Sequence, residues 1–170
     1  MELSNYFKEN ETIISDPVEI SNKFNEYFIS VGPKLAERIQ NNNVNFTTFL
    51  GERSVNSIFL DAVPEKEVEI GVGNLHGNKS CGHDEIPPKL VKEISKQIIK
   101  PLAHIYSQSL LTGVIPDELK IALVTPVFKA NSKEEFSNYR PISVLPCLSK
   151  ILENIMYKRV MKYFSAVNKF

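Results

Sequence analysis

Apolar residues recur every three or four positions over four stretches of the chain, and this spacing is typical of amphipathic helices. Asp16 followed by Pro17 indicates a helix start, because the carboxylate caps free amides and proline fits the first turn. Gly32 and Pro33 are expected to kink or split the first helix, and Pro101 to break the third. The predicted helices cover, in chain order, residues 17–40, 63–71, 88–111 and 147–166.

The pattern changes after the third helix. Residues 120–128 are rich in Ile, Val, Thr and Phe, which predicts a largely buried strand, and Pro126 within it suits an edge position. Residues 139–145 are expected to return beside it, whereas residues 1–15 show no recognisable motif. The fold class is therefore predicted to be α+β, mainly helical, with one antiparallel β-ribbon.

Composition narrows the class of protein. With 170 residues and 42% hydrophobic residues, the chain can bury a core as one domain, or as one domain with an arm. The formal net charge of +0 argues against a general polyanion binder. Residues 1–78 are acidic and residues 79–170 are basic, however, which keeps a nucleic acid or nucleotide partner open for the second part.

Two features bear on the compartment. Cys81 and Cys147 are far apart in sequence, and no secretory signal precedes them, which favours two reduced thiols in an intracellular, non-secreted protein. No apolar run approaches the roughly 20 residues that a membrane-spanning helix needs, so no membrane partner is expected.

The candidate chemistry lies on the predicted ribbon. Lys129 ends the first strand and Arg140 begins the second, so two cations are expected at neighbouring strand ends. The planar fork of arginine and the mobile charge of lysine suit the oxygens of a phosphate chain. The alternative is that both are ordinary exposed cations, for which Glu134 and Glu135 are available partners. From the residues alone, both interpretations stay open.

Several motifs occur in a recognisable order. The chain contains ISNKFNEYFISVGPKLAERI from Ile20, NKSCGHDEIPPKLVKEI from Asn78, PVFK from Pro126, NYRPIS from Asn138 and SKILENIMYKRV from Ser149. Together they resemble the reverse transcriptases of non-LTR retrotransposons, particularly the jockey-like group. The resemblance implies a helical linker region over residues 1–62. Residues 63–170 would then be the N-terminal (fingers) part of an RNA-directed DNA polymerase domain, truncated before the palm.

The resemblance also implies roles for single residues. Lys129 and Arg140 would bind the incoming deoxynucleoside triphosphate, and Lys79 would contact the template. The implied partners are an RNA template and a DNA primer. The transfer step needs metal ions held by carboxylates, and every aspartate of the chain precedes the ribbon. No catalytic residue, metal site or cofactor is therefore expected in this chain, which should be inactive alone, and Mg²⁺ is expected only in a full-length polymerase. The four aspartates are Asp16, Asp61, Asp84 and Asp117.

The chain departs from the family pattern in two loops. Relatives tend to have Pro-Gly-Pro-Asp-Gly where residues 81–85 are Cys-Gly-His-Asp-Glu, so Glu85 replaces a glycine that is expected to take a positive φ. Ala130 and Asn131 replace the usual Lys-Gly after the first strand.

Two alternatives remain. The chain is also consistent with a non-catalytic helical interaction or nucleic-acid-binding module derived from a retroelement. Zinc could be considered at His76, Cys81 and His83, but no second pair of ligands completes a tetrahedral set.

Overall fold

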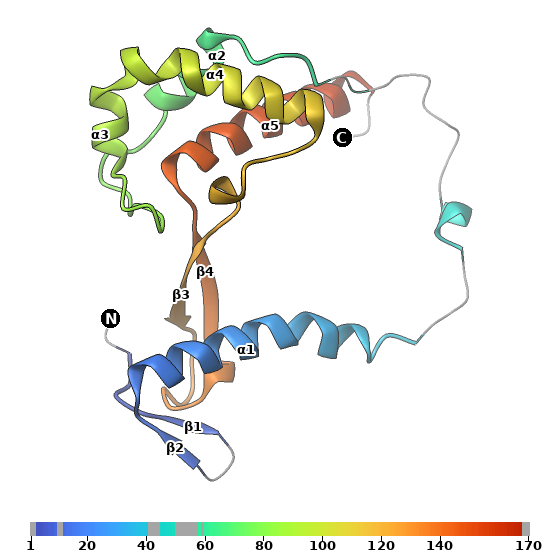
Figure 1. Ribbon diagram of the computed structural model, residues 1–170. Coiled ribbons are helices and arrows are strands. Elements are labelled where there is room, and N and C mark those ends of the chain that lie inside the picture. Colours follow the sequence, from blue (N-terminus) through green and yellow to red (C-terminus); the bar gives the residue numbers. More distant parts are fainter. Residues whose placement is uncertain (1–2, 10–11, 41–44, 50–57, 59, 168–170) are drawn as a thin grey trace. The chain divides into compact units, whose positions relative to one another are not determined.

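The computed structural model describes residues 3–9, 12–40, 45–49, 58 and 60–167 (Figure 1). The α-helices within these residues are α1 (Pro17–Ala36), α2 (Glu65–Gly73), α3 (Pro88–Glu93), α4 (Ser95–Thr112) and α5 (Cys147–Ala166). The strands are β1 (Phe7–Glu9), β2 (Thr12–Ile14), β3 (Leu123–Phe128) and β4 (Tyr139–Val144). Single 3₁₀ turns lie at η1 (Phe46–Phe49), η2 (Asp117–Leu119) and η3 (Phe136–Asn138). The strands form two antiparallel ribbons, β1–β2 and β3–β4, which confirms the mainly helical α+β class.

The chain forms two compact units. Unit 1 consists of Met1–Leu50 and Val124–Ser143, and unit 2 of Gly51–Leu123 and Val144–Phe170. Most of the β3–β4 ribbon therefore belongs with the N-terminal segment. The expected boundary between residues 62 and 63 concerns the domains of a longer polymerase and stays a prediction.

Unit 1 is built around an aromatic cluster. The Asp16 carboxylate caps α1 by accepting a hydrogen bond from the Glu19 amide at 2.8 Å. Pro33 lies inside α1 and does not split it, and the helix ends at Ala36, earlier than the predicted residue 40. Pro33 lacks the amide that would bond to the carbonyl of Ile29, so it removes one hydrogen bond of the helix close to its end. The buried residues of the cluster are Phe7, Ile14, Phe24, Phe136 and Tyr139.

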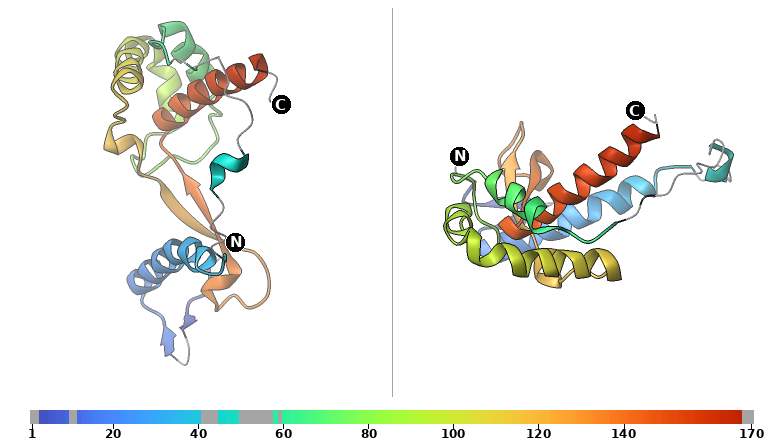
Figure 2. Two further views of the ribbon diagram at one scale, coloured as in Figure 1. Left: turned by 90° about the vertical axis from the view of Figure 1, so that its right-hand side faces the viewer. Right: turned by 90° about the horizontal axis from the view of Figure 1, so that it is seen from above.

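Unit 2 is a helical layer in which α2 packs against both α4 and α5 (Figure 2). Tyr106 of α4 is fully buried, and its hydroxyl donates a hydrogen bond to the carbonyl of Leu148 at 2.8 Å. Burial raises the pKa of Tyr106. Arg159 of α5 donates hydrogen bonds to the carbonyls of Asp61 and Ala62, which attaches the segment before α2 to α5.

Two local predictions are wrong. The third predicted helix breaks at Ile94 (φ −94°, ψ 14°), and Pro101 lies inside α4. Leu102 and Tyr106 both enter the core just after the proline, and burying two such side chains contributes about 1.5–3 kcal/mol each, which offsets the cost of the ring. The predicted buried strand is instead exposed over Leu123–Thr125, because a two-stranded ribbon has two open edges.

Both cysteines of the chain lie among the described residues, in unit 2. Cys81 and Cys147 are both free. None of the helices in the described part of the chain has the length and hydrophobicity needed to cross a bilayer.

Candidate functional site

The two predicted phosphate-binding cations lie together on the β3–β4 ribbon in unit 1. Lys129 directly follows β3, and its amide donates a hydrogen bond to the carbonyl of Asn138 at 2.8 Å. This bond places Lys129 opposite Asn138, and Arg140 is two residues further along the second strand. Diagonal neighbours of this kind on an antiparallel pair have Cα atoms roughly 7–8 Å apart. Lys129 and Arg140 thus lie at neighbouring ends of the two strands of the ribbon.

Both cationic side chains are exposed and available. Neither forms a hydrogen bond or ion pair with another residue in the described part of the chain. The two acids of the same loop have other partners. Glu134 accepts a hydrogen bond from the Tyr6 hydroxyl and pairs with Lys8, and Glu135 accepts one from the Asn138 amide at 3.2 Å. Neither Glu134 nor Glu135 therefore pairs with the two cations, and the alternative that both are ordinary exposed cations stays open.

The two residues before Arg140 are buried and hydrogen-bonded, and they fix the backbone that carries the arginine. Asn138 is 9% exposed, and its side-chain amide donates to the carbonyl of Ser132 at 2.9 Å. Tyr139 is 5% exposed, and its hydroxyl donates to the carbonyl of Lys133 at 2.8 Å. Burial also raises the pKa of Tyr139. Since successive side chains of a strand point to opposite faces, burying Tyr139 directs Arg140 towards solvent.

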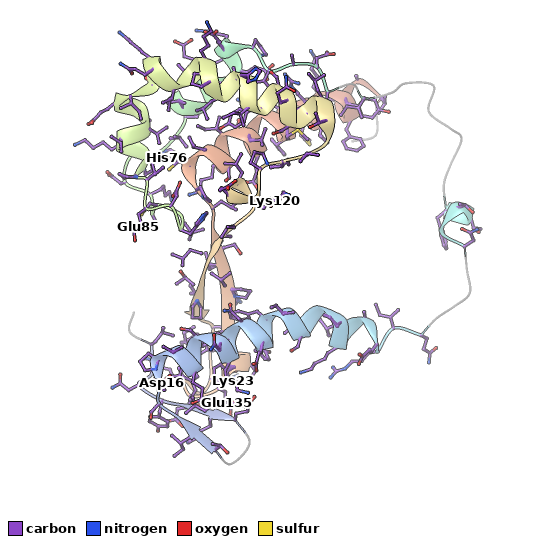
Figure 3. All side chains as sticks on the ribbon, in the orientation of Figure 1. Asp16, Lys23, His76, Glu85, Lys120 and Glu135 are labelled. Atoms are coloured by element: carbon purple, nitrogen blue, oxygen red, sulfur yellow. The ribbon has the colours of Figure 1, made fainter. Side chains whose placement is uncertain are left out.

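The backbone supports the two expected glycine positions. Glu85 has φ 56° in the loop that leads to α3 (Figure 3), so the prediction of a positive φ there is confirmed. Asn131 has φ 70° at the position where the family pattern has a glycine. Asparagine tolerates this conformation better than most residues, because its short polar side chain can form local hydrogen bonds. The loop after β3 therefore keeps a turn that glycine would favour.

Lys79 belongs to unit 2, in the loop that precedes α3. Its side chain is exposed, and its amide donates a hydrogen bond to the carbonyl of His76 at 3.1 Å. Gly82, three residues later, has a structural role that the sequence reasoning missed. A Cβ atom at Gly82 would lie 2.5 Å from the nitrogen of Pro146, so the loop packs directly on the backbone before α5. A glycine between Cys81 and His83 was the only available signal.

Three of the four aspartate side chains have structural roles. Asp16 caps α1, Asp84 accepts a hydrogen bond from the Ile86 amide at 3.2 Å, and Asp117 pairs with Lys120 at 2.8 Å. Hydrogen bonding to Lys120 lowers the pKa of Asp117. Among the described residues, the carboxylates do not gather into a group of three or more that could hold metal ions, so this part of the chain does not fit a pair of catalytic Mg²⁺ ions.

Zinc also has no site among the described residues. No group of three or more His, Cys, Asp or Glu side chains in this part of the chain is arranged to hold a metal ion. His76, Cys81 and His83 all lie within it. The sequence-based zinc interpretation has no support in the structure.

Comparison with known proteins gives several relatives. No protein-family model matches the chain. Over 96 residues the chain is 35% identical to the "Putative 115 kDa protein in type-1 retrotransposable element R1DM" of Drosophila melanogaster. The aligned segment covers 55% of this chain and 9% of that protein. Over 106 residues it is 29% identical to the "RNA-directed DNA polymerase from mobile element jockey" of the same organism, covering 62% and 12% of the two chains. A "Retrovirus-related Pol polyprotein from type-1 retrotransposable element R1" of Bradysia coprophila is 33% identical over 96 residues, covering 55% of this chain and 10% of that protein.

The resemblance to non-LTR retrotransposon reverse transcriptases is confirmed. These relatives come from several elements of the same kind, and the matched residues make up more than half of this chain. The chain spans between 9% and 12% of the length of the relatives it matches. It is thus similar to a fragment of a retrotransposon RNA-directed DNA polymerase.

Proposed function

We propose that this chain contributes the contacts of such a polymerase to the incoming deoxynucleoside triphosphate, through Lys129 and Arg140, and to the RNA template, through Lys79. A DNA primer is the other implied partner. The observation that carries the proposal is the pair of exposed cations on one ribbon, neither of which pairs with a carboxylate among the described residues. Arg140 directly follows the buried Tyr139. The family resemblance gives the same two residues the same role.

The chemistry of the two cations fits a triphosphate. The guanidinium of Arg140 offers a planar fork of donors that can bind two oxygens of one phosphoryl group, and the Lys129 ammonium supplies a second, mobile charge for its neighbour. Such contacts position the reacting phosphoryl group, which is a substantial part of phosphoryl-transfer catalysis. They do not supply the transfer itself, which requires metal ions that the dispersed aspartates of this chain do not assemble. We therefore expect Mg²⁺ to act only in a full-length polymerase.

Nucleotide binding by the 170-residue chain is the direct test. Anisotropy of a fluorescent deoxynucleoside triphosphate would give its dissociation constant, with unlabelled dTTP as competitor. Lys129→Ala and Arg140→Ala are each expected to weaken binding by about 3–10-fold, which corresponds to roughly 1 kcal/mol for a solvent-exposed charged hydrogen bond. Lys133→Ala is the matched control, because Lys133 is an exposed lysine of the same loop. Equal effects of all three substitutions would refute a specific site.

The proposal also predicts that the chain alone does not synthesise DNA. With a primed RNA template, Mg²⁺ and all four deoxynucleotides, we expect no primer extension above background. Extension that disappears in Arg140→Ala would contradict the assignment of the metal-binding residues to another part of the polymerase.

A second function, non-catalytic nucleic-acid binding, is favoured by a separate observation. Lys89 and Lys92 on α3, and Lys96 and Lys100 on α4, are exposed and pair with no carboxylate in the described residues. A surface of this kind would bind phosphate backbones with an affinity that falls steeply with salt. If Lys96→Ala weakens RNA binding while the ribbon substitutions leave dTTP binding unchanged, this second function is the better account.

A further inference from the structure

The loop between the two candidate cations is attached to the N-terminal hairpin. This segment, residues 130–138, is named the ribbon loop. The amide of Lys8 in β1 donates a hydrogen bond to the carbonyl of Glu134 at 2.7 Å, so the loop is bonded along the edge of the hairpin. Both partners belong to unit 1. The hairpin and the candidate site are therefore parts of one packed body.

The side chains on one face of β1 hold the same loop residue. Glu134 pairs with the ammonium of Lys8 and accepts a hydrogen bond from the hydroxyl of Tyr6. Lys8 and then Tyr6 lower the pKa of Glu134, and Glu134 in turn raises the pKa of both partners. The carboxylate is therefore held from two sides, by the residues that flank Phe7 in sequence.

Phe7 itself points to the opposite face and anchors the end of the loop. Its side chain is 0% exposed, its ring stacks on Phe136 at 4.8 Å between centroids, and it contacts Tyr139 at 5.5 Å. Phe24 of α1 packs edge-on against both Phe136 and Tyr139, at 4.8 and 5.2 Å. Tyr139 directly precedes Arg140. The hairpin thus contacts the ribbon loop at its centre and at the residue that orients the arginine.

We propose that the β1–β2 hairpin is a positioning element for a triphosphate ligand, acting through Tyr6, Phe7 and Lys8 on the ribbon loop. This inference rests on the proposed function of Lys129 and Arg140. Among the described residues, the hairpin forms no hydrogen bond or ion pair with the side chain of either cation. By fixing Glu134 and Tyr139 it sets the separation of the two cations, and a ligand that bridges both gains affinity when that separation is fixed beforehand.

Neutralising Glu134 distinguishes an effect of charge from an effect of loop position, because the two change the affinity for a nucleotide in opposite directions. It is an anion in the same loop as the two cations, so neutralising it should tighten binding of an anionic nucleotide if charge alone matters. If Glu134 acts by holding the loop on β1, neutralising it should weaken that binding. Glu135 is the matched control, since Glu135→Gln removes the same charge one residue away and keeps an oxygen that can accept from Asn138.

The experiment measures dTTP and dTMP affinities of the full chain for Tyr6→Phe, Glu134→Gln and Glu135→Gln. We expect Tyr6→Phe and Glu134→Gln to weaken dTTP binding about 2–5-fold, as expected for a loosened charged hydrogen bond. They should leave dTMP binding unchanged, because a single phosphate contacts one cation. Glu135→Gln should bind dTTP as tightly as the unmodified chain or tighter. A purely structural defect would lower both affinities together, and would overturn the positioning role.

Arg140→Ala, measured alongside, separates this inference from the proposed function. If Arg140→Ala weakens dTTP binding while Glu134→Gln behaves like Glu135→Gln, the positioning role is wrong and the nucleotide site stands. If Arg140→Ala has no effect, the nucleotide site is wrong and the positioning role falls with it.

Discussion

Replacing Gly82 with alanine is expected to destabilise unit 2, although Gly82 lies in a loop. A Cβ atom at this position would lie 2.5 Å from the nitrogen and 2.7 Å from the Cα of Pro146, and 3.0 Å from the carbonyl carbon of Leu145. Favourable separations between such atoms are about 3.5–4.0 Å. All three are backbone atoms just before α5, so no side-chain rotation can relieve the overlap, and the loop must move away from the helix start.

The size of the effect follows from two opposing terms. Overpacking typically lowers the free energy of unfolding by about 1–3 kcal/mol, and contact with fixed backbone puts this site in the upper part of that range. Alanine also reduces the freedom of the unfolded chain, which raises stability by about 0.4–1 kcal/mol where the native φ is compatible. Gly82 does not take a positive φ, so this second term applies. The net loss is expected to be about 2 kcal/mol.

Gly77 provides the control. It lies in the same stretch between α2 and α3, does not take a positive φ, and would place a Cβ atom with nothing within 4 Å. Gly77→Ala should therefore show only the stabilising term. Urea unfolding followed by far-UV circular dichroism would give the free energy of unfolding of the two variants. The comparison is valid when this free energy has the same dependence on urea concentration in both. If Gly82→Ala is as stable as Gly77→Ala to within about 0.5 kcal/mol, the close approach to Pro146 does not constrain the loop.

Two further predictions concern the backbone conformation of Glu85 and the pKa of Tyr106. Glu85→Gly should raise the free energy of unfolding by about 0.5–1 kcal/mol in the same urea assay. Relieving a left-handed residue gains about 1–2 kcal/mol, and the greater backbone freedom of glycine in the unfolded chain takes back about 0.5–1 kcal/mol of that gain. Asn131→Gly should raise the free energy of unfolding by less, because asparagine tolerates this conformation better. Burial raises the pKa of Tyr106 above its ordinary value of 10.0. The unfolded chain therefore loses this proton first, so the stability that the neutral phenol provides is present below about pH 10 and is lost as the pH rises towards the folded-state pKa. Urea titrations across this range should show a smaller decline for Tyr106→Phe, and an unchanged decline would mean that another group controls it.

Two helices show how much the sequence can predict, because a periodic apolar face marks α5 and a recognisable start marks α1. α5 was predicted over residues 147–166 and spans Cys147–Ala166. The start of α1 followed from Asp16 and Pro17. The break at Ile94 was not predictable, because it depends on how two helices pack on one core and not on a local helix breaker.

The N-terminal hairpin shows where sequence reasoning stops. Its strands are three residues long, which is too short for a period-2 pattern to emerge. Phe7 looks like an isolated apolar residue in a polar segment, and only folding reveals that it stacks on Phe136 from the other end of the chain. The positions of Lys129 and Arg140 near the strand ends were predictable, because they depend on local sequence. The contacts that hold Glu134 were not, because they join residues far apart in the chain.

The loop before α3 carries Glu85 at a position where the family pattern has a glycine. Glu85 occupies a backbone conformation that disfavours it, so the surroundings must impose that conformation. They do so from both sides. The Glu85 amide donates to the carbonyl of Gly82 at 3.2 Å, and the carbonyl of Ile86 accepts a hydrogen bond from the buried Cys147 thiol at 3.4 Å. Glu85 therefore adds a negative charge and about 1 kcal/mol of strain relative to a glycine in the same conformation. Lys79 lies six residues before Glu85 in this loop, which therefore carries a negative charge that a glycine at position 85 would not provide. Any template contact there should be weaker than in a relative with glycine, and Glu85→Gly should strengthen the binding of RNA.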